Sequence, residues 1–175
     1  KVDQVLAECP TVKHRIVLGR AGGGWREYER LMAGASPEMA HPRNASGDPM
    51  MVYFTSGTTG FPKMVLHTHA SYPIGHIITG KFWLDNTPED LHWTISDTGW
   101  AQAAWTSFFA PWNMGAAIFV WDARGKKFDS QETLAMFERF PITTFFAPPT
   151  AYRMMVQEPL RKYRYPTLRH CMGAG

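Results

Sequence analysis

Two kinds of apolar pattern alternate along the second half of the chain. Short segments rich in apolar and β-branched residues are typical of strands, and longer segments with apolar residues every three or four positions are typical of helices. The predicted strands are 91–95, 116–121, 142–147 and 168–172, and the predicted helices are 71–82, 100–112, 130–140 and 150–157. Strands that alternate with helices favour an α/β fold, with a mostly parallel sheet and flanking helices. Ser130 is the expected N-cap of the helix at 130–140.

The first half of the chain is less regular. Its pattern predicts helices at 2–9 and 25–32, a short buried strand at 14–19 and a surface connector at 34–49. Residues 50–54 (MMVYF) form an apolar run too short for a typical helix, and a second β-prone run follows at 64–66. We interpret 50–54 as a buried strand that leads into the loop between the two runs.

That loop, residues 55–63 with the sequence TSGTTGFPK, combines hydroxyl groups, glycines and one lysine. Glycines allow the backbone to approach a ligand closely, hydroxyls and amides donate hydrogen bonds, and Lys63 adds a positive charge. This composition suits a polyphosphate. A hydroxyl-rich loop without a ligand fits the same composition.

A Walker A phosphate loop is a poor match to the same residues. Gly57 and Lys63 have the spacing of its first glycine and its lysine, but Pro62 replaces the second glycine and Met64 replaces the magnesium-binding Ser or Thr. Lys63 also leads into a β-prone run, whereas a Walker loop opens a helix. We therefore do not favour this interpretation.

The string YFTSGTTGFPK at 53–63 resembles, without a gap, the phosphate-loop signature of the adenylate-forming superfamily. This superfamily includes acyl-CoA synthetases, luciferases and peptide-synthetase adenylation domains. The segment VLHTH at 65–69 resembles the part that follows the loop in these enzymes. The segments PPTAYR at 148–153 and LRHCMGAG at 168–175 resemble later landmarks of the same superfamily.

Two further segments narrow the resemblance to one branch. SDTGW at 96–100 resembles the D-x-G-W stretch of acetyl-CoA and medium-chain acyl-CoA synthetases, and 100–121 is most similar to the mitochondrial medium-chain acyl-CoA synthetase family. The resemblance implies ATP-dependent activation of a medium-chain fatty acid to acyl-adenylate and then acyl-CoA, with release of AMP and pyrophosphate. It implies ATP, Mg²⁺ and coenzyme A as participants, and the mitochondrial matrix as location.

The resemblance also assigns residue roles. The triphosphate grip comprises Thr55, Ser56, Gly57, Thr58, Thr59, Gly60, Phe61, Pro62 and Lys63, with Lys63 also balancing charge during catalysis. Trp100 is expected to wall the acyl pocket, although a buried core aromatic is the alternative. Gly173, Ala174 and Gly175 are expected to narrow the passage between acyl pocket and adenine, although a plain strand-end turn fits nearly as well.

The resemblance further implies that residues 1–175 are a partial AMP-binding domain, the large N-terminal domain of such an enzyme, without the small C-terminal domain. The later adenine, ribose and catalytic-lysine segments do not occur in the sequence, so we expect the isolated chain to be inactive. Two other functions remain open at this point. One is an adenylating enzyme whose acceptor is a carrier protein or oxygen, and the other is a nucleotide-binding module without activity.

Composition limits the other partners. A formal net charge of +3 with short basic clusters does not predict nucleic-acid binding, and no apolar stretch is long enough to span a membrane. Cys9 and Cys171 lie in no metal-binding or disulfide pattern. His67 and His69 form an H-x-H pair without a neighbouring ligand, so we expect no metal site there. The sequence does not predict the oligomeric state.

Overall fold

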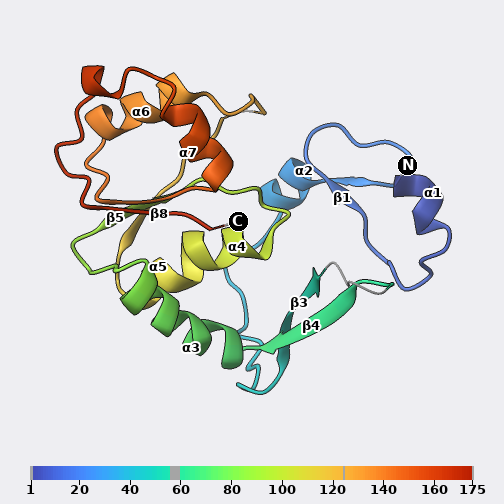
Figure 1. The fold of residues 1–175 in the computed structure, drawn as a ribbon. Helices are drawn as coiled ribbons and strands as arrows, with labels where there is room; N and C mark the ends of the chain where they lie inside the picture. The colour runs from blue at the N-terminus through green and yellow to red at the C-terminus, as the bar shows by residue number, and fades with distance from the viewer. Residues whose placement is uncertain (1, 56–59, 124, 175) are drawn as a thin grey trace. The chain divides into compact units, whose positions relative to one another are not determined.

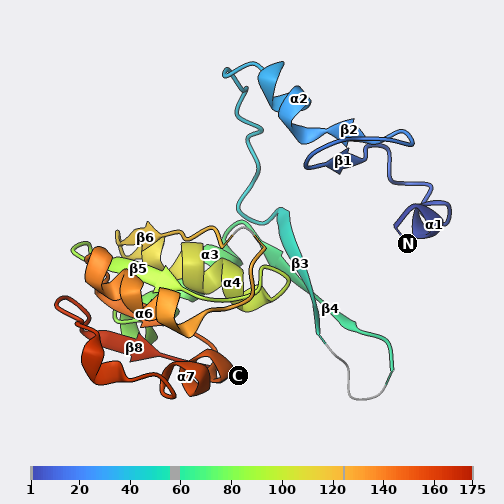
Figure 2. The ribbon, with the colours of Figure 1, turned by 90° about the horizontal axis from the view of Figure 1, so that it is seen from above.

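The computed structural model describes residues 2–55, 60–123 and 125–174. The chain divides into two compact units, Lys1–Arg43 and Asn44–Gly175 (Figures 1 and 2). Among the residues that the structure describes, no helix has the length and apolar character needed to cross a membrane. Cys9 and Cys171 are both free thiols.

The smaller unit has little regular structure. Its elements are α1 (Val2–Leu6), β1 (Ile16–Val17), β2 (Arg26–Glu27) and α2 (Tyr28–Ala33), with β1 and β2 parallel. Polar contacts connect its parts: the indole N–H of Trp25 donates to Asp3 at 2.8 Å. The prediction of a buried strand at 14–19 is wrong in its burial, because Ile16 is 50% exposed.

The larger unit contains a four-stranded parallel sheet, which confirms the predicted fold class. The strand order is β6-β5-β7-β8, and every neighbouring pair is parallel. The strands are β5 (Leu91–Thr94), β6 (Ala117–Phe119), β7 (Thr144–Phe146) and β8 (His170–Met172). The helices are α3 (Ser71–Ile78), α4 (Ala101–Ala104), α5 (Ala110–Asn113), α6 (Ser130–Arg139), α7 (Pro149–Met155), the π-helical segments η1 (Thr79–Trp83) and η2 (Trp105–Phe109), and the 3₁₀ turn η3 (Leu160–Lys162).

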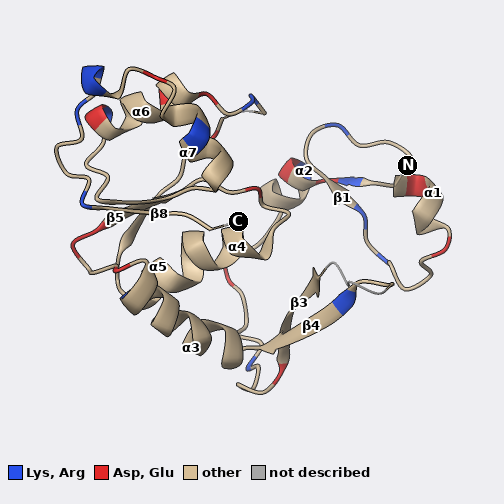
Figure 3. Ribbon diagram, viewed as in Figure 1, with Lys and Arg blue, Asp and Glu red and all other residues tan. Residues whose placement is uncertain are grey.

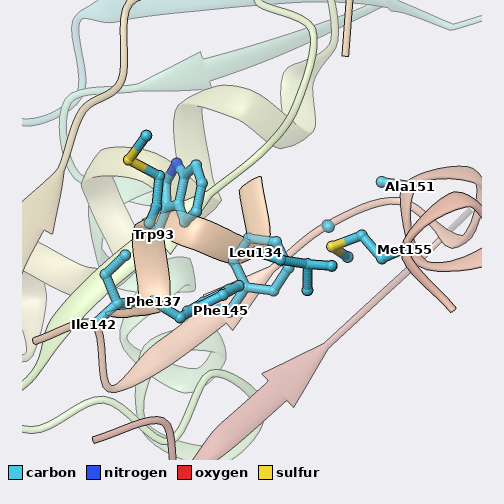
Figure 4. Packing of buried hydrophobic residues seen from close by; sticks show 9 residues of the cluster. Trp93, Leu134, Phe137, Ile142, Phe145, Ala151 and Met155 are labelled. Atoms are coloured by element: carbon cyan, nitrogen blue, oxygen red, sulfur yellow. The ribbon is translucent and has the colours of Figure 1, made fainter. Parts of the chain in front are cut away.

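Helices cover both faces of this sheet. Alternate residues of a strand point to opposite faces, so Trp93 and Phe145 pack against α6 and α7, whereas Phe146 packs on the other face with Leu84 and Ala110. Figure 1 shows α6 and α7 on one face and α3 and α5 on the other. Figure 4 shows the larger cluster, in which Leu134, Phe137 and Met155 surround the strand residues.

The N-terminus of α6 differs by one residue from the prediction. Asp129 is the N-cap, and its carboxylate accepts a hydrogen bond from the amide of Glu132 at 2.9 Å. Ser130 is instead the first helical residue and is buried. The expected cap at Ser130 was therefore wrong.

Asp90 connects the beginnings of three parallel strands. Its carboxylate accepts hydrogen bonds from Thr143 at 2.7 Å and from the guanidinium of Arg169, which lies 2.6 Å away in an ion pair. Arg169 also pairs with the more exposed Asp85 at 2.7 Å. Burial alone would raise the pKa of Asp90, but the hydrogen bonds from Arg169, Thr143 and the amide of Thr87 lower it to about 2.

The close approach of η1 and α5 requires glycine at position 80. A Cβ on Gly80 in η1 would lie 2.5 Å from the carbonyl oxygen of Ala110 and 2.9 Å from Cγ of Met114. No real side chain fits at such distances, so η1 and α5 approach this closely only because residue 80 has no side chain. Gly75 in α3 has nothing within 4 Å of a built Cβ.

Strands β3 (Pro49–Thr55) and β4 (Lys63–Thr68) form an antiparallel hairpin that is separate from the parallel sheet (Figure 2). The prediction that 50–54 is a buried strand was wrong. Phe54 is 68% exposed and Val52 is 45% exposed. The strand pairs with β4 alone, and α3 contacts it at Tyr53, so Val52 and Phe54 stay exposed.

We predict that Gly80→Ala destabilises the larger unit by about 1 to 3 kcal/mol, because the added methyl group overpacks the crossing of η1 and α5. Urea unfolding measures the change. Gly75→Ala is the matched control and should be neutral or stabilising by up to about 1 kcal/mol, since alanine favours a helix. Equal effects of the two variants would contradict the steric explanation.

We predict that Arg169→Met lowers the free energy of unfolding at pH 7 by about 2 to 4 kcal/mol, because Asp90 then remains almost buried without its cation. Asp85→Asn removes the more exposed ion pair and should cost about 0 to 1 kcal/mol. Urea unfolding of both variants tests the difference. A loss in Asp85→Asn as large as that in Arg169→Met would refute the role given to Asp90.

Candidate functional site

The hairpin places Lys63 at the end of the glycine-rich loop. Thr55 is the last residue of β3 and pairs directly with Lys63, the first residue of β4, and both are exposed. Lys63 thus begins a strand and not a helix, which confirms the argument against a Walker loop. Gly60 adopts a φ of 141°, in the region that favours glycine, and Phe61 is 95% exposed. Ser56, Gly57, Thr58 and Thr59 of the predicted grip lie outside the described residues.

Aromatic contacts join this hairpin to α3. The hydroxyl groups of Tyr53 in β3 and Tyr72 in α3 are hydrogen-bonded at 3.0 Å. The ring of His67 in β4 packs edge-on against Tyr72, with centroids 4.8 Å apart. Tyr72 is 4% exposed, and burial, followed by its contact with Tyr53, raises its pKa. The sequence alone does not reveal this contact between the two tyrosines, because it joins a strand to a separate helix.

The aromatic contacts continue toward the parallel sheet. His76 in α3 stacks on Trp105 in η2, with the ring planes only 3° apart, and Trp105 contacts Trp83 in η1. Burial, and secondly the charge of His67, lower the pKa of His76. Both tryptophans also contact Phe146 at the end of β7. His76 also packs edge-on against Tyr72, with centroids 4.4 Å apart, so aromatic contacts are continuous from β3 to the carboxyl end of the sheet.

Trp100 lies on the surface at the start of α4. Asp97 shapes the turn before it, because its carboxylate accepts from the amide of Gly99 at 2.7 Å and its carbonyl accepts from the amide of Trp100 at 3.0 Å. Trp100 is the N-cap of α4 and is 69% exposed. This exposure argues against the alternative that Trp100 is a buried core aromatic.

The predicted passage residues face different sides of the strand end. Ala174 packs on the cluster that contains Leu84 and Phe146, on the sheet face that carries α3 and α5. A Cβ on Gly173 would instead meet Tyr152 of α7. Gly175 lies outside the described residues. The pocket role of Trp100, Gly173, Ala174 and Gly175 therefore remains a prediction, and Ala174 is the one that packs on the layer containing Trp83.

One cavity of about 340 Å³ lies near the carboxyl ends of β5 and β6. Apolar side chains such as Trp93, Phe119 and Phe128 line it, together with Thr98 of the segment before Trp100. Trp100, Gly173 and Ala174 do not contribute to its lining. The cavity is therefore a different place from the predicted acyl passage.

The two histidines of the H-x-H pair contact different groups. His67 packs against aromatic rings, whereas Nε2 of His69 lies 2.9 Å from the side-chain amide of Asn44. Within the described ranges, no group of three or more His, Cys, Asp and Glu side chains could hold a metal ion. Lys and Arg are dispersed among Asp and Glu along the ribbon (Figure 3).

A buried polar chain lies under the site, on β5 and β7. Nδ2 of Asn86 donates to the hydroxyl of Thr144 at 3.0 Å, Thr144 lies 2.8 Å from Nδ1 of His92, and Nε2 of His92 lies 3.0 Å from the hydroxyl of Thr94. Thr144 donates to Nδ1 of His92 if the neutral imidazole carries its proton on Nε2, which then donates to Thr94; the other tautomer reverses both directions. Burial lowers the pKa of His92 to about 4, against smaller opposing effects of Asp90 and the backbone at Thr106.

We predict that stability falls as the pH drops from about 6.5 to about 4, because an unfolded histidine binds a proton near pH 6.5 while folded His92 remains neutral. The unfolded chain binds more protons in this window, so the loss reaches about 3 kcal/mol at its acid end. Urea unfolding across this pH range measures the slope. A slope that is unchanged in His92→Gln would contradict the assignment.

Comparison with known proteins gives this geometry a family. The family model described as AMP-binding enzyme matches residues 1–175. The chain is 42% identical to human acyl-coenzyme A synthetase ACSM4, mitochondrial, and 39% identical to human ACSM3, mitochondrial, in each case over 99% of this chain and 30% of the relative. Mouse ACSM5, mitochondrial, is 42% identical over the whole chain. The chain thus spans about a third of the length of these relatives.

Solved structures agree on the fold. The anthranilate CoA ligase AuaEII, crystallised with anthranoyl-AMP, aligns with a TM-score of 0.80 at 22% identity and covers 99% of this chain and 34% of its own. An acyl-CoA synthetase of Brucella canis aligns with a TM-score of 0.80 at 24% identity, over 99% of this chain and 32% of its own. The family match over the full length shows that this chain belongs to the AMP-binding enzyme family.

Proposed function

We propose that the chain is part of an AMP-forming acyl-CoA synthetase that activates a medium-chain carboxylic acid. The observation that carries the proposal is the identity of about 40% with several acyl-coenzyme A synthetases over 99% of this chain. The D-x-G-W stretch at 97–100 supports the same branch. These relatives are named acyl-coenzyme A synthetases, which favours coenzyme A over a carrier protein or oxygen as the acceptor of the acyl group.

The proposed reaction has two displacements. A carboxylate oxygen of the acid attacks the α-phosphorus of ATP, the bond to the bridging oxygen breaks, and pyrophosphate leaves as the acyl-adenylate forms. The thiolate of coenzyme A then attacks the carbonyl carbon, and AMP leaves with the electrons of the broken C–O bond. In both steps, negative charge grows on a phosphate leaving group, and preorganised donors nearby lower the barrier.

Lys63 is the described residue best suited to the first displacement. Its ammonium group is exposed at the start of β4, and pairing with Thr55 fixes its position relative to β3. A charge there would stabilise the leaving pyrophosphate, with hydroxyls and amides of the loop at 55–62 as additional donors. Trp100 and Ala174 are proposed to border the acyl group, because both lie at the carboxyl end of the parallel strands, where α/β sheets bind ligands.

We include Mg²⁺ in the proposal only because the family resemblance implies it. The described residues offer no group that could hold the ion by itself, so none of the steps above is assigned to it. When Mg²⁺ accompanies ATP, it neutralises phosphate charge. The names of the relatives also support a mitochondrial location, and we propose the matrix.

The test is a product assay on the full-length protein that contains this chain. We expect release of pyrophosphate only when a carboxylic acid is present, and release of AMP with acyl-CoA only when coenzyme A is also added. Acids of different length, from acetate to palmitate, test the medium-chain preference. An adenylate that accumulates and ignores coenzyme A would refute the proposal in favour of another acceptor.

We predict that Lys63→Met lowers kcat/KM for ATP about 10- to 100-fold, because a charge-assisted hydrogen bond contributes about 1.5 to 3 kcal/mol. Lys81→Met removes an exposed lysine of η1 outside the loop and is the matched control. Steady-state kinetics with varied ATP measure both variants. Lys63→Met kinetics equal to those of the control would exclude the proposed role of Lys63.

A further inference from the structure

Tyr152 of α7 lies over the carboxyl ends of β7 and β8. Its hydroxyl donates a hydrogen bond to the carbonyl of Met172 at 2.8 Å, and the carbonyl of Phe145 lies 3.4 Å from the same hydroxyl. The ring packs edge-on against Phe145, with centroids 5.8 Å apart. A single side chain therefore contacts the backbone of both strands where they end.

The same ring closes one side of Gly173. A Cβ at this position would lie 3.2 Å from Cε2 of Tyr152 and 3.0 Å from the carbonyl oxygen of Ala147. Both distances are tighter than ordinary contacts. Gly173 thus lies against α7 and the end of β7 on one side, although it is exposed on the other, and Ala174 follows it on the opposite sheet face, against the cluster that contains Phe146 and Leu84.

The hydroxyl bond adds a constraint that the sheet does not supply alone. The carbonyl of Met172 also accepts from the amide of Ala147 at 3.1 Å. Without the tyrosine hydroxyl, that carbonyl keeps one partner, so loss of the hydroxyl loosens the strand end but leaves the sheet paired. Burial, and secondly the neighbouring Cys171, raise the pKa of Tyr152, so the hydroxyl keeps its proton at neutral pH.

We propose that Tyr152 is a positioning residue. By holding the carbonyl of Met172 and lying against one side of Gly173, it fixes the place of Ala174 and with it the width of the acyl passage. The link to the acyl passage rests on the proposed function. The claim that Tyr152 holds the end of β8 rests only on the contacts of Tyr152 described above.

The first experiment measures the stability of the end of β8, residues 172–174, by a method that does not depend on enzyme activity. Tyr152→Phe removes only the hydroxyl, and Tyr165→Phe is the matched control, since the hydroxyl of Tyr165 donates to the carbonyl of Leu160 at 3.3 Å and its ring packs on Phe137 of the same core. Hydrogen exchange followed by mass spectrometry should show faster exchange in peptides covering 168–174, by about two- to tenfold, in Tyr152→Phe. Unchanged exchange there, or the same change in Tyr165→Phe, overturns the proposal.

The second experiment follows the acid in the full-length protein. We expect Tyr152→Phe to raise KM for the carboxylic acid about three- to tenfold while kcat changes less than about twofold, because the passage and not the leaving group is displaced. Tyr165→Phe should keep both constants. Faster exchange with an unchanged KM would refute the link to the acid while leaving the contact with the turn established.

The two experiments separate the inference from the function on which it rests. A wild-type protein that forms no acyl-CoA from any acid refutes the proposed function and the acyl passage together. The exchange measurement then still decides whether Tyr152 holds the strand end. Gly173→Ala gives an independent check, because a methyl group pressed against Tyr152 should increase exchange in the same peptides.

Discussion

The carboxylate of Asp90 sets the frame on which the larger unit depends. It stands before β5, and it binds Thr143 before β7 and Arg169 before β8. Parallel strands that are fixed together at their amino ends also end at a common edge. The predicted family segments at 96–100 after β5 and 148–153 after β7, and the predicted passage residues 173–174 after β8, therefore all follow the same edge of the sheet. A charge at one end of the sheet thus determines the geometry at the other.

The two faces of the sheet differ in polarity. On one face, Trp93 and Phe145 join the large apolar cluster with α6 and α7. On the other, His92 and Thr144 form a buried polar chain beside Phe146. Such a chain is costly unless its members are paired, and burial lowers the pKa of His92, which therefore stays neutral at neutral pH. Trp105 and Ala174 pack on this polar face. The side chains whose buried polar groups need hydrogen-bond partners therefore lie beside the proposed passage.

Local patterns predicted the parallel sheet because short strand-like segments such as 91–95 and 142–147 alternate with segments of helical periodicity. The apolar run at 50–54 predicted the strand but not its exposure, because whether a strand is covered depends on distant residues. The predicted N-cap was Ser130 and the observed one is Asp129. Both side chains can cap a helix, and the backbone conformation determines which residue does so. The phosphate loop and Trp100 could be singled out from their motifs. The contacts of Tyr72 and Tyr152 could not, because they join elements whose proximity no local periodicity encodes.

The hairpin register has a further consequence for how this region can change over time. Successive side chains of a strand point to opposite faces, so a shift of one residue in the pairing of β4 with β3 would turn Lys63 to the other face. Replacement of single side chains leaves that register intact. We therefore expect relatives of this chain to vary at exposed hairpin residues outside 55–63, such as Val52 and Leu66, but to keep the register in which Thr55 pairs with Lys63.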